Sequence, residues 1–352
     1  MRYEKREIGR SGICASPIAI GCWAFGGGSY WGAQAQGDVD AVVSAALERG
    51  YELFNTAEGY NDGASETSLG AALKGRRDRA LISTKFAAAH AYPDELRASC
   101  EASLRRLGTD YIDIYMLHWP ITAKTFSGAP ADARVKVSPP RADEMFATLD
   151  ALKREGKIRA YGVSNYGPEQ LREAEALGAD IQCNEIAYNI FSRAIERDIL
   201  PYCAEKRISI LTTMTIQQGV LAGKYARPED VPPNQAHSRH FSAERGGSAQ
   251  RHGCAGAEKE MFDALPKLYD IARELGVTPA QLAVAWCVQN DAVSAALVGC
   301  RNLRQLEENT GADGLVIPPE TMARIADISE PVLAKLGFSA DYYESPENGR
   351  IF

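Results

Sequence analysis

Apolar residues along the chain gather in short runs, and longer segments of mixed polarity separate these runs. Between the runs, apolar residues recur at three- and four-residue spacing, as at Leu96, Cys100 and Leu104, which is typical of helices. Eight runs are predicted to be buried strands: 15–21, 51–56, 80–85, 112–118, 160–164, 181–185, 208–213 and 295–299. The helical segments carry the expected end signals, namely prolines that open them (Pro93, Pro168) and glycines that follow them (Gly50, Gly108, Gly156, Gly178).

Eight strand–helix alternations predict an α/β fold, a closed (β/α)₈ TIM barrel. A doubly wound sheet is the structural alternative, but no GxGxxG follows the first predicted strand. Residues 2–13 are expected to form a hairpin that turns at 9–12 and closes the barrel floor. The whole chain, 1–352, is therefore expected to be a single barrel domain.

Two long segments interrupt the alternation, 122–141 and 226–256. Both follow strands on the side where a barrel carries its active site, so we expect loops that cover the site. For the second segment, an unstructured excursion without function is an equal alternative. The tail, 341–352, folds either over the site or against a neighbour, and the sequence does not choose between them.

Composition narrows the function classes. The net charge of −7 argues against a binder of nucleic-acid backbones. No apolar span of signal-peptide or transmembrane length occurs, and the eight cysteines are dispersed without a CxxC pair. These features predict a cytoplasmic protein with reduced thiols and no metal site.

Three residues suited to carbonyl chemistry follow or end consecutive predicted strands: Tyr60, Lys85 and His118. A lysine ammonium is expected to lower the pKa of a nearby tyrosine, which then donates a proton to a developing alkoxide. A neutral histidine can orient the same oxygen. Each residue alone is better explained structurally, but the convergence of three at one rim favours chemistry.

The chain resembles the aldo-keto reductases over nearly its whole length. The segments that carry the resemblance are 48–60 (ERGYELFNTAEGY), 110–118 (DYIDIYMLH) and 162–165 (GVSN). The resemblance is greatest to the branch with potassium-channel β subunits and bacterial sugar- or glyceraldehyde-type reductases. It implies a catalytic set of Asp, Tyr, Lys and His, of which Tyr60, Lys85 and His118 take the last three places. Asn55 stands where the family has Asp, so Lys85 is expected to acidify Tyr60 more strongly but to be held less firmly.

The resemblance also implies NADP(H) as cofactor. It places the adenosine phosphates near the end of the eighth strand, where an arginine favours NADP over NAD. Thr213 replaces an aromatic residue that stacks on the nicotinamide in most relatives, and Trp23 is the candidate to compensate. The implied cofactor residues are Trp23, Ser164, Asn165, Gln182, Thr213, Lys224, Gly299, Arg301, Gln305, Glu308 and Asn309.

Aromatic residues near strand ends are expected to form apolar pocket walls, compatible with a sugar-like substrate. Trp31 and Trp119 are the main candidates, with Tyr30 nearby, while Tyr188 is as readily a packing residue. The predicted function is an NADP(H)-dependent oxidoreductase that interconverts a carbonyl and an alcohol on a small molecule. Two alternatives stay open: an epimerase-type enzyme that retains its cofactor, and a nucleotide-sensing regulatory subunit with weak turnover.

Overall fold

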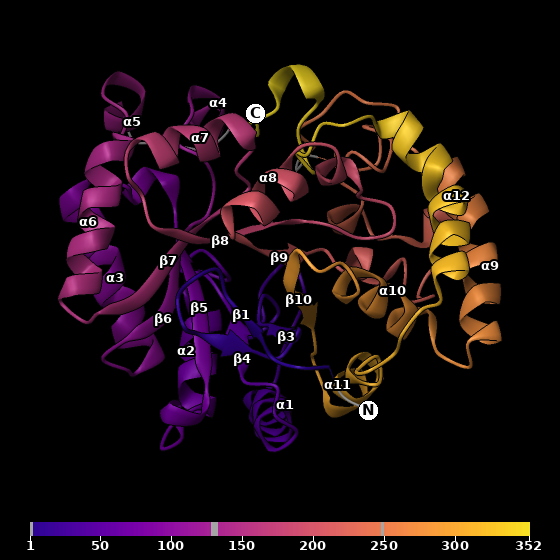
Figure 1. Cartoon of the computed structure of the whole chain (residues 1–352), viewed down its shortest axis with the longest axis horizontal. Helices are drawn as coiled ribbons and strands as arrows, with labels where there is room; N and C mark the ends of the chain where they lie inside the picture. The colour runs from indigo at the N-terminus through magenta and orange to yellow at the C-terminus, as the bar shows by residue number, and fades with distance from the viewer. Residues whose placement is uncertain (1–2, 128–132, 248–249) are drawn as a thin grey trace.

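The computed structural model describes residues 3–127, 133–247 and 250–352, and eight parallel strands within them close into a barrel (Figure 1). The order around the barrel is β10-β3-β4-β5-β6-β7-β8-β9, and every neighbouring pair is parallel. The strands are β3 (Ile18–Gly21), β4 (Leu53–Asn55), β5 (Leu81–Phe86), β6 (Ile112–Leu117), β7 (Ile158–Ser164), β8 (Ile181–Ala187), β9 (Ser209–Thr213) and β10 (Val293–Gly299). Each predicted run overlaps one of these strands, and the predicted barrel is confirmed.

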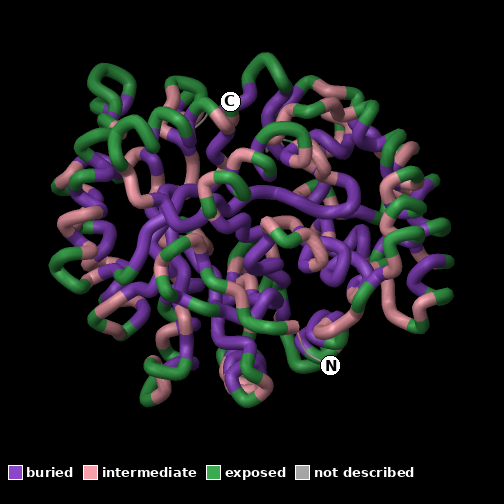
Figure 2. The backbone as a smooth tube through the Cα atoms, viewed as in Figure 1, coloured by how far each residue is buried: buried purple, intermediate pink, exposed green. Residues whose placement is uncertain are grey.

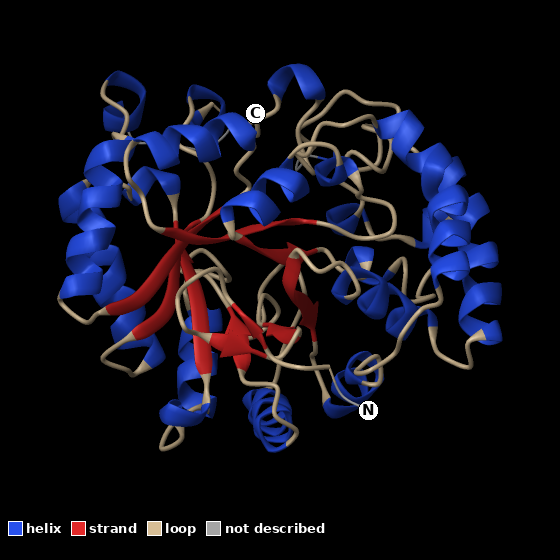
Figure 3. Ribbon diagram, in the orientation of Figure 1, coloured by secondary structure: helices blue, strands red, loops and turns tan. Residues whose placement is uncertain are grey.

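Helices surround the barrel, as Figure 3 shows. Pro93 and Pro168 open two of them, because proline already has a helical φ and the first turn does not need its missing N–H. The helices are α1 (Gln36–Glu48), α2 (Ala64–Ala72), α3 (Pro93–Leu107), α4 (Ala123–Phe126), α5 (Ala133–Val137), α6 (Ala142–Arg154), α7 (Pro168–Ala176), α8 (Ile199–Lys206), α9 (Glu258–Glu274), α10 (Pro279–Val288), α11 (Leu303–Thr310) and α12 (Pro319–Leu336).

A short antiparallel hairpin, β1 (Arg6–Glu7) and β2 (Cys14–Ala15), closes the amino-terminal end of the barrel. The amide of Gly9 donates to the hydroxyl of Ser209 at the start of β9. Ile8 and Ile13 are buried in the same apolar cluster as the barrel interior. The predicted hairpin and its place at the barrel floor are therefore confirmed.

The barrel interior is apolar in its lower and middle layers. Figure 2 shows the backbone of the strands as a nearly continuous buried region. Side chains that fill the interior include Leu53, Ile114, Met116, Cys183 and Leu211. The polar side chains of Asn55, Lys85 and Glu185 lie further along the strands, toward their carboxyl ends, and are also buried. Charges at that depth interact strongly because water does not screen them.

Candidate active site at the carboxyl ends of the strands

The four residues expected to do chemistry meet at the carboxyl ends of β4, β5 and β6. Lys85 is completely buried, and its Nζ lies 2.9 Å from Oδ1 of Asn55 and 3.2 Å from the hydroxyl of Tyr60. The His118 ring meets the Tyr60 ring edge-on, with 5.5 Å between the centroids. Adjacent parallel strands bring these residues together, since their carboxyl ends open on the same rim.

A fifth polar residue, Glu185 on β8, completes this cluster and was not among the predicted site residues. Its Oε1 lies 3.1 Å from Nζ of Lys85, and its Oε2 accepts a 2.6 Å hydrogen bond from Nδ2 of Asn55. Asn55 Nδ2 also donates to the hydroxyl of Ser83 at 2.8 Å. The sequence held one signal for Glu185, an acidic residue at the end of a strand predicted to be buried, where an unpaired carboxylate is rare.

The electrostatics of the cluster follow from burial and from the Lys85–Glu185 pair. Burial by itself lowers the pKa of Lys85, but Glu185 and Tyr60 outweigh it, so the lysine pKa is raised. Burial raises the pKa of Tyr60, and the opposing effect of Lys85 does not cancel it. The expected net lowering of the tyrosine pKa is therefore wrong, although Lys85 does act on it in the expected direction. Burial, with Lys85 adding to it, lowers the pKa of His118 to about 3, so this imidazole is neutral at physiological pH.

Of the predicted cofactor residues on or next to β7 and β8, some lie at the active-site rim and one lies at the barrel floor. Ser164 donates to the carbonyl of Glu185, and Asn165 donates to the carbonyl of His118, so both lie at the active-site rim as expected. Gln182 does not: its Oε1 accepts from the amide of Arg10 in the floor hairpin. Its predicted role as a nicotinamide-binding residue is wrong, because the amino-terminal part of β8 lies at the opposite end of the barrel.

Aromatic side chains from the loop after β3 form one wall of the site. Trp23 stacks on Tyr60 with 5.6 Å between ring centroids, and on Tyr30 with 4.6 Å. Trp31 meets Trp23 edge-on at 5.3 Å. These contacts place Trp23 directly against Tyr60 and Trp31 behind Trp23, on the side where the sequence predicts a pocket wall.

A second wall comes from Trp119, which follows His118. A groove that both residues line runs outward past α3 to Phe126 and Val135. Tyr188, in contrast, is buried against Trp286 of α10, with 4.9 Å between ring centroids, and its hydroxyl donates to Glu196. Tyr188 is a packing residue outside the pocket.

The segment after β10 combines a helix start with a firmly held arginine. The side chain of Asn302 caps α11 by accepting from the amide of Gln305, and Oε1 of Gln305 accepts from the amide of Arg301. Asn309 donates back to the carbonyl of Gly299. Within the first turn of a helix, amides have no helical acceptor, so the amides of residues 303 and 304 remain available to an anion. Glu308 is half-buried on the same helix.

Arg301 also holds the loop that follows β3. Its guanidinium donates to Oε1 of Gln34 and to the carbonyls of Trp31 and Ala33. Three of its five N–H donors are thereby used, which the sequence did not indicate. Lys224 is exposed beside Tyr225, and none of the described acidic side chains pairs with it.

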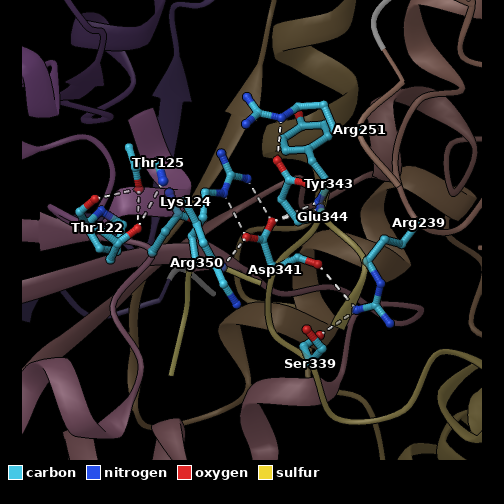
Figure 4. A network of polar contacts seen from close by, with 12 residues as sticks. Thr122, Lys124, Thr125, Arg239, Arg251, Ser339, Asp341, Tyr343, Glu344 and Arg350 are labelled. Carbon is cyan, nitrogen blue, oxygen red and sulfur yellow. Dashed lines mark hydrogen bonds and ion pairs between the residues drawn. The ribbon is translucent and has the colours of Figure 1, made fainter. Parts of the chain in front are cut away.

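The two segments whose role the sequence left open meet each other above the rim (Figure 4). Arg239, from the 226–256 segment, donates to the carbonyls of Leu336, Ser339 and Asp341. Arg251 of the same segment pairs with Glu344 of the tail. We call these joined segments, 226–247, 250–256 and 337–352, the cover. Residues 128–132 and 248–249, within the two predicted loops, lie outside the described part of the chain.

The tail of the cover folds back over the site rather than projecting away. Tyr343 lies 6.5 Å from Trp119 between ring centroids, and the guanidinium of Arg350 lies 3.5 Å above the Trp119 ring. The carbonyl of Phe352 accepts from the amides of Glu169 and Gln170 at the start of α7. The expected covering is thus observed for the 226–256 segment, as far as it is described, and the tail, for which the sequence left two placements open, folds over the site.

Three features of the described residues bear on the other sequence expectations. All eight cysteines are free thiols. No group of three or more potential metal ligands occurs in ranges 3–127, 133–247 and 250–352. Among the helices described, none has both the length and the apolar character needed to cross a membrane.

Known proteins with similar sequences and structures agree with this fold. The profile of the aldo/keto reductase family matches residues 17–330. The chain is 31% identical to the aldo-keto reductase YhdN of Bacillus subtilis over 344 residues, 94% of this chain and 95% of that protein. It is 30% identical to the NADH-specific methylglyoxal reductase of Escherichia coli, covering 88% of this chain and 93% of that one. A solved aldo-keto reductase of Klebsiella pneumoniae in complex with NADPH superposes with a TM-score of 0.70 at 26% identity, over 94% of this chain and 96% of that one. The chain belongs to the aldo/keto reductase family and is an oxidoreductase that reduces carbonyls.

Proposed function

We propose that this enzyme uses NADPH to reduce a small aldehyde or ketone, with Tyr60 as the proton donor. The observation that carries the proposal is the contact between Nζ of Lys85 and the hydroxyl of Tyr60, 3.2 Å apart, at a rim shared with His118. A phenol, an ammonium and a neutral imidazole in one place are the groups needed to protonate and orient a carbonyl oxygen.

The chain's own residues would act on the carbonyl oxygen while the bound nicotinamide supplies the hydride to the carbonyl carbon. The Tyr60 hydroxyl transfers its proton to the oxygen as negative charge develops there. Lys85 stabilises the tyrosinate that is left, because its buried ammonium lies next to the phenol oxygen. His118, neutral at physiological pH, donates a hydrogen bond that holds the oxygen in line with Tyr60.

Several groups fit a dinucleotide with an extra phosphate. The start of α11 offers backbone amides to a phosphate, and the exposed Lys224 offers a positive charge. Arg301 has two N–H donors left for a 2′-phosphate, which favours NADPH over NADH. Ser164 and Asn165, at the rim beside His118, would hold the carboxamide of the nicotinamide. Thr213 at the end of β9 offers no ring, so stacking on the nicotinamide would depend on Trp23.

The shape of the site indicates the substrate class. Aromatic walls lie beside the polar end formed by Tyr60 and His118: Trp23 stacks on Tyr60 with Trp31 edge-on behind it, and Trp119 lines a groove with His118. Such walls suit short aldehydes and ketones, and they also suit the apolar face of a keto-sugar. The relation to a methylglyoxal reductase supports a small oxo-compound as substrate.

Titration of intrinsic tryptophan fluorescence with NADPH and NADH tests the cofactor, because Trp23, Trp31 and Trp119 all lie at the site. NADPH consumption on a panel of 2-oxoaldehydes, simple aldehydes and keto-sugars, with identification of the alcohol formed, tests the reaction. Tighter binding of NADPH than NADH together with alcohol formation supports the proposal. Tight binding without net consumption points to an epimerase-type or sensing function, and absence of binding to either nucleotide contradicts the proposal.

A further inference from the structure

The cluster beneath Tyr60 contains a carboxylate, but β8 supplies it rather than β4. We infer that Glu185 is the positioning residue that holds Lys85 against Tyr60, and that Asn55 is the neutral bridge which this arrangement requires. The inference rests on the proposed role of Tyr60 as proton donor. In this arrangement the carboxylate that pairs with Lys85 has not been lost from the site but has moved from β4 to β8.

Hydrogen-bond polarity fixes the role of Asn55. Its Oδ1 accepts from the ammonium of Lys85 at 2.9 Å, while its Nδ2 donates to Oε2 of Glu185 at 2.6 Å. A carboxylate at position 55 would set two anionic oxygens at that 2.6 Å spacing, which is stable only if they share a proton. With Glu185 present, an amide at position 55 is therefore the complementary partner.

Burial makes the charge of Glu185 necessary. The Lys85 side chain is 0% exposed and that of Glu185 is 2% exposed. A buried ammonium without a nearby anion is costly and tends to lose its proton. A lysine without its proton would no longer stabilise a tyrosinate.

The other titratable groups around the pair do not supply this negative charge. Burial raises the pKa of the thiols of Cys22 and Cys183, so both are neutral. His118 is neutral as well, and burial raises the pKa of Tyr343 well above its usual value. Glu185 is thus the anion that faces Lys85.

A charge swap between positions 55 and 185 tests the inference. The variants are Glu185→Gln, Asn55→Asp and the double variant, which moves the carboxylate back to β4 and places the amide on β8. In the double variant the amide at 185 donates to the carboxylate at 55, the reverse of the present bond, and Ser83 donates to the same carboxylate. Every donor keeps an acceptor.

Glu185→Gln should move the alkaline limb of the kcat–pH profile to lower pH by about one unit, because the negative charge of Glu185 raises the pKa of Lys85 and its loss lets Lys85 give up its proton at lower pH. Asn55→Asp alone should lose activity as pH rises, since the two carboxylates then repel each other. The double variant should return the limb to within about 0.3 unit of the wild type, a recovery that a purely structural role of Glu185 would not produce.

Thermal unfolding of the same four proteins gives a readout independent of turnover. Each single change should lower Tm, by about 5 °C for Glu185→Gln, and the double variant should recover most of it. Suppose that the wild type reduces no carbonyl while the double variant still recovers the Tm lost in the single variants. In that case the proposed function fails, but the pairing of Lys85 with Glu185 through Asn55 stands. If Glu185→Gln leaves both the pH limb and Tm unchanged, or if Asn55→Asp alone raises activity, the inference is overturned.

Discussion

The ion pair between Asp341 and Arg350 holds the tail of the cover over the site, and replacing Asp341 by Asn should release it. Nε and a terminal nitrogen of Arg350 each donate to Asp341 at 2.8 Å. The amides of Tyr343, Glu344 and Arg350 donate to the same carboxylate. The two side chains are 0% and 4% exposed, so water cannot replace the lost charge (Figure 4).

The expected size of the effect follows from burial. Breaking a buried pair by removing one partner costs about 3–5 kcal/mol. We expect about 3 kcal/mol for Asp341→Asn, because the amide oxygen still accepts some of the backbone hydrogen bonds. At 1.4 kcal/mol per tenfold change, the open form of the tail should become about 100-fold more populated. Arg350 would then leave the Trp119 ring, on which it now lies.

Native-state hydrogen exchange measures this opening. The amides of Tyr343, Glu344 and Arg350 should exchange about 100-fold faster in the variant, while amides of β5 and β6 should not change. Asp270→Asn, which removes an exposed pair with Arg273, is the matched control and should change stability by less than about 0.5 kcal/mol. Unchanged exchange in the tail of the Asp341 variant would refute the reasoning.

The Asp341–Arg350 pair also predicts how the stability of the tail depends on pH. Burial alone raises the pKa of Asp341, but its bonds and charge interaction with Arg350 outweigh this, so the pKa lies below its usual value. A carboxyl with a lowered pKa in the folded state stabilises it above the ordinary carboxyl pKa. Protection of the tail should therefore be constant from neutral pH down to that range and fall as the pH drops through the folded-state pKa.

Three further predictions concern other parts of the molecule. Because the pKa of His118 is about 3, its titration should contribute no acidic limb to kcat between pH 5 and 8, and an NMR titration that finds His118 protonating near pH 6.5 would contradict this. Arg301→Leu should weaken NADPH binding more than NADH binding, and it should also loosen the loop after β3. Fluorescence titration with both nucleotides measures the two affinities, and an equal loss of affinity for both would argue against a 2′-phosphate contact. Gly9→Ala should lower stability more than Gly12→Ala, since both have positive φ but only at Gly9 would a Cβ come within 2.4 Å of the Gln182 carbonyl; equal Tm values would contradict the close packing of the floor.

The fold could be predicted because each strand is a short, mostly apolar run with a helix after it. Pro93 and Pro168 mark helix starts that depend only on local geometry. The convergence of Tyr60, Lys85 and His118 was equally predictable, since position at a parallel strand end fixes the rim on which a residue lies.

The error at Gln182 arises because this residue lies near the amino-terminal end of β8, at the barrel floor, whereas the omission of Glu185 has a different origin. Pairing between β7 and β8 shifts register between Tyr161 and Val163, so the alternation of faces is interrupted along β8. A sequence pattern with a period of two cannot locate such an irregularity. The direction of the Arg301 guanidinium was also unpredictable, because two of its three acceptors are backbone carbonyls about 270 residues away in the chain, which carry no side-chain signal.

Single-turnover reduction of an accepted aldehyde by Tyr60→Phe, with Tyr202→Phe as the control, tests the central claim most directly. Tyr202 lies on α8, where its hydroxyl donates to Glu175 on the surface. We predict that Tyr60→Phe lowers the rate of alcohol formation by about 100-fold or more while NADPH affinity stays within about twofold, and that Tyr202→Phe matches the wild type. A Tyr60→Phe enzyme that forms alcohol at the wild-type rate would contradict the account.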